Sequence, residues 1–149
     1  MISAQHIKEL REKTGAGISD IKKALEENGG DLEKARRAIE QLLGSLAGKR
    51  AGRETRSGLV EVYVHSNGRI GSMVEFLCET DFVARNLQFK ECAHEIAMHI
   101  AAMNPQDADA LLGQPFVKDE EKTVREFVNE ASGRFGENIL VGKFSRFEI

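Results

Sequence analysis

The spacing of apolar residues changes near residue 58 of this chain of 149 residues. Before that point apolar side chains recur every three or four residues, which is typical of amphipathic helices. Directly after it they alternate with polar side chains, which is typical of strands, and from about residue 87 the helical spacing returns. We therefore predict an α+β fold, with an N-terminal three-helix bundle and then a small antiparallel sheet covered by helices.

Residues 1–43 form the predicted bundle. Ser3, Ser19 and Asp31 are placed to cap its three helices, and the glycines of TGAGIS end the first one. The inner faces are expected to carry Ile7, Leu10, Ile21, Ala24, Leu25, Leu32, Ala35, Ala38, Ile39, Leu42 and Leu43. Because so small a bundle buries little surface, we expect a docking domain that binds a partner.

Residues 44–57 are the predicted linker. Four basic residues against one glutamate give it a charge of +3, whereas the whole chain has a net charge of −3. Its glycines favour flexibility, and its charge could contact RNA phosphate or an acidic protein surface. Because no aromatic residue is interleaved, we favour a solvated linker and expect no stable nucleic-acid binding.

Residues 58–149 are the predicted α+β core, of the kind that dimerises. It begins with two alternating stretches, LVEVYVH and RIGSMVEFLC, joined through SNG. Asn67 and Gly68 favour positive backbone angles, so we predict a hairpin with a primed turn. The closing stretch NILVGKFSRFEI is rich in β-branched and aromatic residues and is expected to add a third strand.

Two helices are predicted between the hairpin and the last strand. The first runs from about residue 87 and is stopped by Asn104-Pro105. Its apolar stripe comprises Phe89, Cys92, Ala93, Ile96, Ala97 and Ile100. The second is expected to be capped near Asp119 and to end at Gly133 or Gly136.

The stretch CETDFVARN places a large apolar residue, Phe82, at a corner that follows the second strand. Thr80 and Asp81 are turn and cap formers, so the chain is redirected here. Phe82 either folds back into the core or projects as an anchor for a partner, and the pattern alone favours the core. Thr80 is expected to fix the turn and Val83 to pack beneath it.

No constellation of catalytic residues is recognisable. His94 and His99 are five residues apart and point in different directions on one helix, so we expect surface or partly buried structural histidines and no metal site. Cys78 and Cys92 fit small buried positions. TGAGIS follows no strand and lacks the lysine of a phosphate loop. We predict a protein that is not an enzyme and that needs no cofactor.

Composition limits which partners and which cellular location we expect for this protein. The net charge of −3 gives no general attraction to nucleic acid or anionic membranes. No apolar run approaches the roughly 18 residues that a membrane span needs. The two cysteines lack CxxC spacing, and no apolar signal segment opens the chain, so we expect a cytoplasmic protein.

Three stretches resemble the translation elongation factor Ts family, in the same order and at compatible separations. They are LREKTGAGISDIKKALEENGGD, CETDFVARN and FGENILVGKFSRFE. The resemblance covers nearly the whole chain. It implies a ubiquitin-associated-like bundle that docks on the nucleotide domain of the GTPase elongation factor Tu, and a core that promotes GDP release.

The resemblance also implies partner-binding residues. Asp81 and Phe82 match the pair that wedges near the magnesium site of the GTPase, so Phe82 is expected to project. The docking positions it implies in the bundle are Arg11, Thr14, Gly15, Ile18 and Lys22. Phe135 and Gly136 match a loop that approaches the phosphate-binding segment of the GTPase.

This sequence departs from the larger family members, which carry a second copy of the core and a helical excursion. A single copy predicts a homodimer, formed through sheet edges or the terminal strand. The alternative to an exchange factor is a noncatalytic protein- or RNA-binding module. Such a module would bind without releasing nucleotide.

Overall fold

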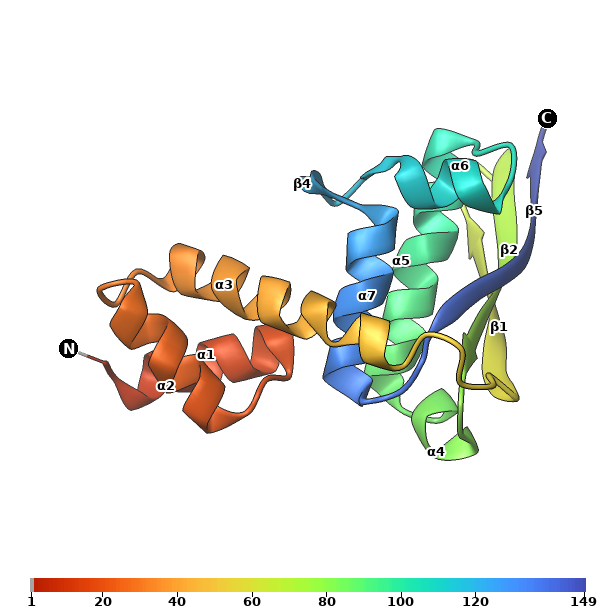
Figure 1. Ribbon diagram of the computed structural model, residues 1–149. Helices are drawn as coiled ribbons and strands as arrows, with labels where there is room; N and C mark the ends of the chain where they lie inside the picture. The colour runs from red at the N-terminus through yellow and green to blue at the C-terminus, as the bar shows by residue number, and fades with distance from the viewer. Residues whose placement is uncertain (1) are drawn as a thin grey trace.

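A computed structural model describes residues 2–149, which fold into an N-terminal helical bundle and an α+β core (Figure 1). The bundle contains α1 (Ala4–Thr14), α2 (Ile18–Glu27) and α3 (Leu32–Ser45). Its buried core consists of Leu10, Ala16, Ile21, Ala24, Leu25, Ala35, Ile39 and Leu43. The predicted α+β fold is confirmed.

The ends of the bundle helices follow from local hydrogen bonding. The Ser3 side chain accepts from the His6 N–H, and Asp31 accepts from the first turn of α3. Gly15 ends α1 in the left-handed conformation, with φ at 72°. The predicted cap at Ser19 is wrong, because α2 already begins at Ile18 and no side chain caps it.

Some predictions for α3 and the following segment need correction. Leu42 lies outside the bundle core, with 43% of its surface exposed, because its neighbour Leu43 occupies the inner face. Helix α3 continues to Ser45, and a 3-10 turn, η1 (Ala47–Lys49), follows within the predicted linker. The next residues contact the core: the Asn138 Nδ2 group donates to the Arg53 carbonyl at 2.8 Å.

The sheet contains β1 (Ser57–Val64), β2 (Ile70–Cys78) and β5 (Leu140–Glu148), all antiparallel in the order β1-β2-β5. The hairpin and the added third strand are therefore confirmed. The primed turn is wrong, because only Gly68 of the Asn67-Gly68 pair has a positive φ. The Gly68 N–H donates to the His65 carbonyl, and a longer loop joins the strands.

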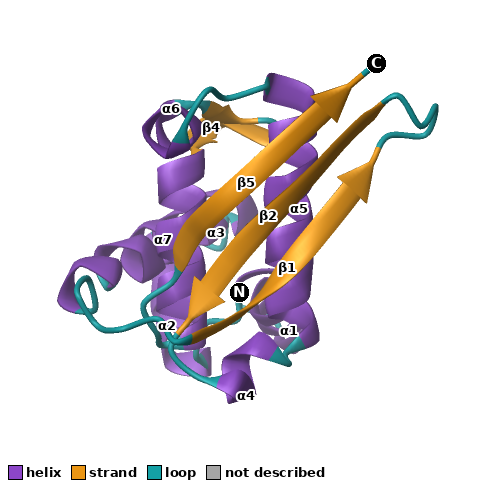
Figure 2. Ribbon diagram, turned by 90° about the vertical axis from the view of Figure 1, so that its right-hand side faces the viewer, coloured by secondary structure: helices purple, strands orange, loops and turns teal. Residues whose placement is uncertain are grey.

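Helices α5 (Leu87–Met103) and α7 (Val124–Phe135) cover one face of the sheet (Figure 2). The whole predicted apolar stripe of α5 is buried, and the left-handed Asn104 ends that helix. The largest fully buried apolar side chains of the core are Phe76, Phe89, Ile96, Ile100, Leu111, Val74 and Val124. Among residues 2–149, no helix is long and apolar enough to cross a bilayer.

Four short elements complete the core: α4 (Asp81–Ala84), α6 (Ala108–Gly113), β3 (Pro115–Phe116) and β4 (Asp119–Thr123). The predicted cap near Asp119 is wrong, because Asp119 lies in β4, which pairs with β3. Helix α7 is instead capped by the Thr123 hydroxyl, which accepts from the Glu126 N–H at 3.2 Å. The charged stretch before Thr123 offers no apolar side chain to bury.

The other face of the sheet is covered by no helix or strand of the described part of the chain, as Figure 2 shows. Its strands are in register there, with Val62 opposite Met73 and Met73 opposite Ser145. The exposed apolar side chains on this face are Val60, Val62, Val64, Met73, Leu140 and Phe147. We call this set the outer sheet face.

Candidate partner-binding site

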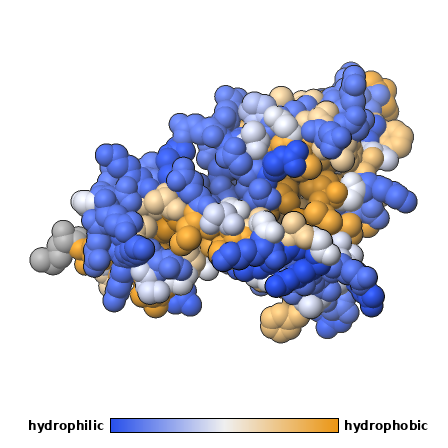
Figure 3. Space-filling view, in the orientation of Figure 1, coloured by the Kyte–Doolittle hydropathy of each residue, from blue (hydrophilic) through white to orange (hydrophobic). Residues whose placement is uncertain are grey.

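The corner after β2 presents a large apolar side chain to solvent. Phe82 lies on α4 and has 88% of its surface exposed, so it projects away from the core. The surface in Figure 3 has an apolar protrusion at its lower edge, where Figure 1 places α4. A single exposed aromatic residue on a protruding corner is suited to insertion into a pocket of another protein.

Neighbouring residues determine the shape of this corner. The Thr80 hydroxyl caps α4 by accepting from the Val83 N–H at 3.3 Å. Val83 is buried in the core, and the Ser57 hydroxyl donates to Asp81 Oδ1 at 2.6 Å. The backbone on both sides of Phe82 is therefore fastened, while its ring is free.

A carboxylate from a distant loop completes the corner. Glu137 lies between α7 and β5 and accepts the N–H groups of Glu79 and Thr80 at 3.0 and 3.1 Å. Sequence reasoning did not identify Glu137 or Ser57. Glu137 lies in the FGEN stretch, but no local pattern shows that it faces a strand end 57 residues away.

The residues implied for docking in the bundle fall into two groups. Arg11, Ile18 and Lys22 are exposed at the end of α1 and the start of α2, and Ile18 has 45% of its surface exposed. Thr14 is buried and its hydroxyl donates to the Leu10 carbonyl at 2.6 Å. Gly15 forms the helix end, so Thr14 and Gly15 shape the surface on which the other three are displayed.

Phe135 and Gly136 close α7. Gly136 has a φ of 72° and donates its N–H to the Ser132 carbonyl. Phe135 is partly buried and meets Phe89 edge to face, with ring centroids 5.8 Å apart. Phe135 therefore contributes to the core, and only part of its surface is available to a partner.

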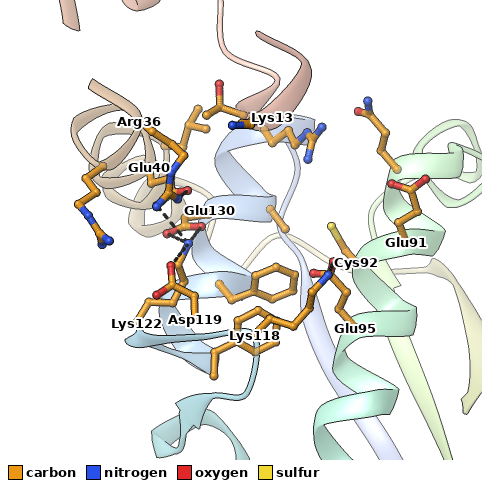
Figure 4. Close-up of a pocket in the computed structure, with 18 of the residues that line it drawn as sticks. Lys13, Arg36, Glu40, Glu91, Cys92, Glu95, Lys118, Asp119, Lys122 and Glu130 are labelled. Atoms are coloured by element: carbon orange, nitrogen blue, oxygen red, sulfur yellow. Dashed lines mark hydrogen bonds and ion pairs between the residues drawn. The ribbon is translucent and has the colours of Figure 1, made fainter. Parts of the chain in front are cut away.

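A cleft of about 610 Å³ lies between the bundle and the core (Figure 4). Lys122 lines one side of it, with Nζ 3.1 Å from Glu40 and 2.9 Å from Glu130. Arg36 pairs with Glu40 from the same helix. Burial raises the pKa of Glu130 to about 7, while Lys122 opposes that rise. These ion pairs join α3 to β4 and α7.

Both cysteines and one histidine of the core lie inside the fold. Cys78 and Cys92 are buried, as predicted, and burial raises the pKa of both thiols, that of Cys92 to about 12. His99 is bonded to Gln114 and is fully buried, so the prediction of a surface or partly buried position is wrong for it, because its ring finds hydrogen-bond partners inside the core. Within residues 2–149, no three His, Cys, Asp or Glu side chains meet as a possible metal site.

Comparison with known proteins places the chain in a family. The family model described as "Elongation factor TS" matches residues 3–110. Elongation factor Ts of Oleidesulfovibrio alaskensis is 41% identical, over 99% of this chain and 98% of its own length. Elongation factor Ts of Fervidobacterium nodosum is 39% identical, over 99% of this chain and 98% of its own length.

Both alignments extend over 193 positions, so at least 44 of them (193 less 149) face gaps in this shorter chain. The match nevertheless runs along nearly the whole sequence, and the exposed corner at Phe82 lies within the part that the family model covers. The chain belongs to the elongation factor Ts family of translation elongation factors.

Proposed function

We propose that this protein is a guanine-nucleotide exchange factor for elongation factor Tu. The observation that supports this most directly is Phe82, which is large, apolar and 88% exposed on a corner whose backbone is fastened. An exposed ring adds little hydrophobic stabilisation to its own fold, so it is available to be buried against a partner. Membership of the elongation factor Ts family supplies the partner.

In the proposed mechanism, GDP is displaced from elongation factor Tu without any covalent bond being made or broken. Burying the Phe82 ring between helices of the GTPase contributes about 1.5–3 kcal/mol, which offsets part of the cost of opening the nucleotide site. Asp81, held next to Ser57, brings a carboxylate toward the magnesium ion. Magnesium and phosphate contacts are then weakened and GDP leaves. The protein itself needs no cofactor and is not an enzyme in the chemical sense.

Exchange requires that the complex of this protein with elongation factor Tu can also separate. Because linkage is reciprocal, a factor that weakens GDP binding by some ratio is itself bound more weakly by that ratio when nucleotide is present. Incoming GTP therefore displaces the exchange factor. Each molecule can act on many copies of elongation factor Tu.

Docking is assigned to the bundle and to one core loop. We propose that helices α1 to α3 are a docking domain, that residues 46–56 connect it to the core, and that the sheet with its helices is the acting core. Arg11, Ile18 and Lys22 contact the GTPase, and Thr14 and Gly15 hold their surface in shape. Phe135 and Gly136 approach the phosphate-binding segment. We expect the protein to act in the cytoplasm.

We further propose that two copies form a homodimer through the outer sheet face. A three-stranded sheet face with several exposed apolar side chains is a site for sheet-on-sheet packing, although Glu75 and Ser145 also lie on it. A second copy offers the same side chains, so the face matches itself about a two-fold axis. The residues that contribute the contact are Val60, Val62, Val64, Met73, Leu140 and Phe147.

The exchange activity can be tested with fluorescent GDP bound to purified elongation factor Tu. Stopped-flow mixing with excess unlabelled GDP measures the release rate at increasing concentrations of this protein. We expect release to accelerate and to saturate. Binding without acceleration would instead identify a noncatalytic docking module, and binding to RNA by the exposed basic residues near Arg53 and Arg56 would then be measured.

A further inference from the structure

We propose that Glu137 is a positioning residue that holds the corner in the shape that presents Phe82. This inference rests on the proposed exchange function. Glu137 acts on the backbone two and three residues before Phe82, where the second strand gives way to α4.

The Glu137 carboxylate makes three hydrogen bonds to two consecutive residues. Oε1 accepts the N–H of Glu79 at 3.0 Å and that of Thr80 at 3.1 Å. Oε2 accepts the Thr80 hydroxyl at 2.7 Å. Hydrogen bonds to an ionised acceptor are stronger than those between neutral groups. One side chain therefore fixes both the direction of the strand end and the rotamer of Thr80.

The Thr80 hydroxyl transmits this constraint to α4. A hydroxyl has one hydrogen to donate and two lone pairs with which to accept. Because Glu137 takes the hydrogen, the oxygen is left to accept the Val83 N–H and so to cap the helix. The orientation of the cap is thus set by the carboxylate rather than by Thr80 alone.

We call the hydrogen bonds between residues 79–80 and residues 137–138 the clasp. They run in both directions. Glu79 Oε2 accepts the Asn138 N–H at 2.6 Å, so each of the two segments supplies a carboxylate to the backbone of the other. Glu137 is itself held in place, because the buried Ser132 hydroxyl donates to its carbonyl at 2.7 Å. These hydrogen bonds join the end of α7 to the end of β2, in addition to the apolar contacts of the core beneath them.

Phe82 depends on such supports. Helix α4 has only four residues, and an isolated helix of that length is not stable in water. The Phe82 ring is almost fully exposed, so it contributes nothing to its own position. Without the clasp, the corner has to be ordered at the moment of binding, which weakens the action of the wedge.

The test combines Glu137→Ala and Glu137→Gln with Phe82→Ala in a double-mutant cycle of GDP release. We expect Glu137→Ala to slow saturated release about tenfold, the usual scale for losing hydrogen bonds to a charged group. Glu137→Gln keeps one acceptor and is expected to lose less. Because Glu137 acts through Phe82, the Phe82→Ala/Glu137→Ala double variant should match Phe82→Ala alone. The matched control is Glu120→Gln, an exposed glutamate, and it should not change the rate.

Hydrogen exchange gives a readout that does not depend on activity. In the wild-type protein the N–H groups of Glu79 and Thr80 should exchange slowly, and Glu137→Ala should expose both while the core amides stay protected. The proposal is overturned if Glu137→Ala leaves the protection of these two amides unchanged or releases GDP at the wild-type rate. It is also overturned if the effects of Glu137→Ala and Phe82→Ala on the release rate add in the double variant. If the wild-type protein fails to accelerate release, the exchange function fails, and the protection of the two amides still decides whether the clasp exists.

Discussion

Gly133 of α7 lies so close to Leu43 of α3 that a Cβ atom at residue 133 would be 2.2 Å from the Leu43 carbonyl oxygen. Real Cβ atoms do not approach backbone so closely. The absence of a side chain at Gly133 therefore allows a helix of the bundle to pack directly on a helix of the core. The position of the docking surface relative to the corner depends on this contact.

Gly133→Ala is expected to destabilise the protein, although alanine normally favours a helix interior by about 0.5–1 kcal/mol over glycine. The added methyl group overpacks the contact with Leu43, which costs about 1–3 kcal/mol. Urea unfolding measures the difference. The matched control is Gly44→Ala in α3, where no atom lies within 4 Å of the new Cβ, and it should stabilise. Equal stabilisation by both would show that α3 and α7 do not pack this way in solution.

The charge of Glu130 makes the stability of the protein depend on pH. Its folded pKa is raised to about 7, first by burial and then by Glu40 and Glu126, from 4.5 for the free side chain. Between these values the folded protein holds a proton that the unfolded chain has released. The stability contributed is full below about pH 4.5 and is lost as the pH rises through about 7.

Replacing Glu130 with glutamine keeps the neutral form at every pH. We expect Glu130→Gln and the wild type to have similar melting temperatures near pH 5, because both are then uncharged at this position. The variant should become the more stable of the two as the pH rises to 8, although Lys122 then loses a charged partner. Glu120→Gln, at an exposed position, should show no such trend. If the difference in melting temperature between Glu130→Gln and the wild type stays constant with pH, Glu130 is not the source of this pH dependence.

His99 should make the protein sensitive to acid. Its Nδ1 accepts the Val117 N–H at 3.1 Å, and Nε2 lies 2.9 Å from Gln114 Oε1, so only the neutral ring fits. Burial lowers its pKa below 6.5. The stability from this group is therefore present above pH 6.5 and is lost as the pH falls through the folded pKa.

We expect His99→Gln to destabilise the protein by about 1–3 kcal/mol at pH 7, because buried donors and acceptors lose their partners. The variant should also lose less stability than the wild type between pH 7 and 5. Denaturant unfolding at several pH values measures both effects. His94→Gln, at an exposed position of the same helix, is the control. An identical acid loss in the wild type and His99→Gln would rule out His99 as the sensitive group.

The proposed dimer can be tested by placing a charge at the centre of the outer sheet face. Met73→Lys puts an ammonium group where two apolar faces would meet, so sedimentation should show a shift toward monomer. Met103→Lys, at the exposed end of α5, should leave the association unchanged. A wild-type protein that sediments as a monomer at micromolar concentration would contradict the dimer.

The sequence was most informative where one physical property decides the structure. All six residues predicted for the α5 stripe are buried, because a helix of 17 residues must bury a regular apolar face, but the buried His99 and Ala101 of the same helix were not predicted. Asp119 was misassigned because Asp119 and Thr123 are both good caps, and only the pairing of β3 with β4 decides between them. Local preferences could not settle that choice.

Contacts between distant segments could not be predicted in the same way. The alternation of Val60, Val62 and Val64 with their neighbours predicts a strand, yet these valines face outward while Glu61 is buried. The direction in which these side chains point depends on which face of the sheet α5 and α7 cover. Likewise, Phe82 is exposed although its side chain is hydrophobic. Thr80 and Val83 hold the corner in a shape that points the ring away from the core.

The most direct test of the account compares Phe82→Ala with Met103→Ala, a matched exposed apolar position at the far end of α5, in stopped-flow release of fluorescent GDP from elongation factor Tu. Both variants should fold normally, because neither side chain is buried. Losing the burial of the ring should slow release by Phe82→Ala about tenfold or more at saturation, whereas Met103→Ala should match the wild type. Release by Phe82→Ala at the wild-type rate would contradict the role of Phe82 as the wedge.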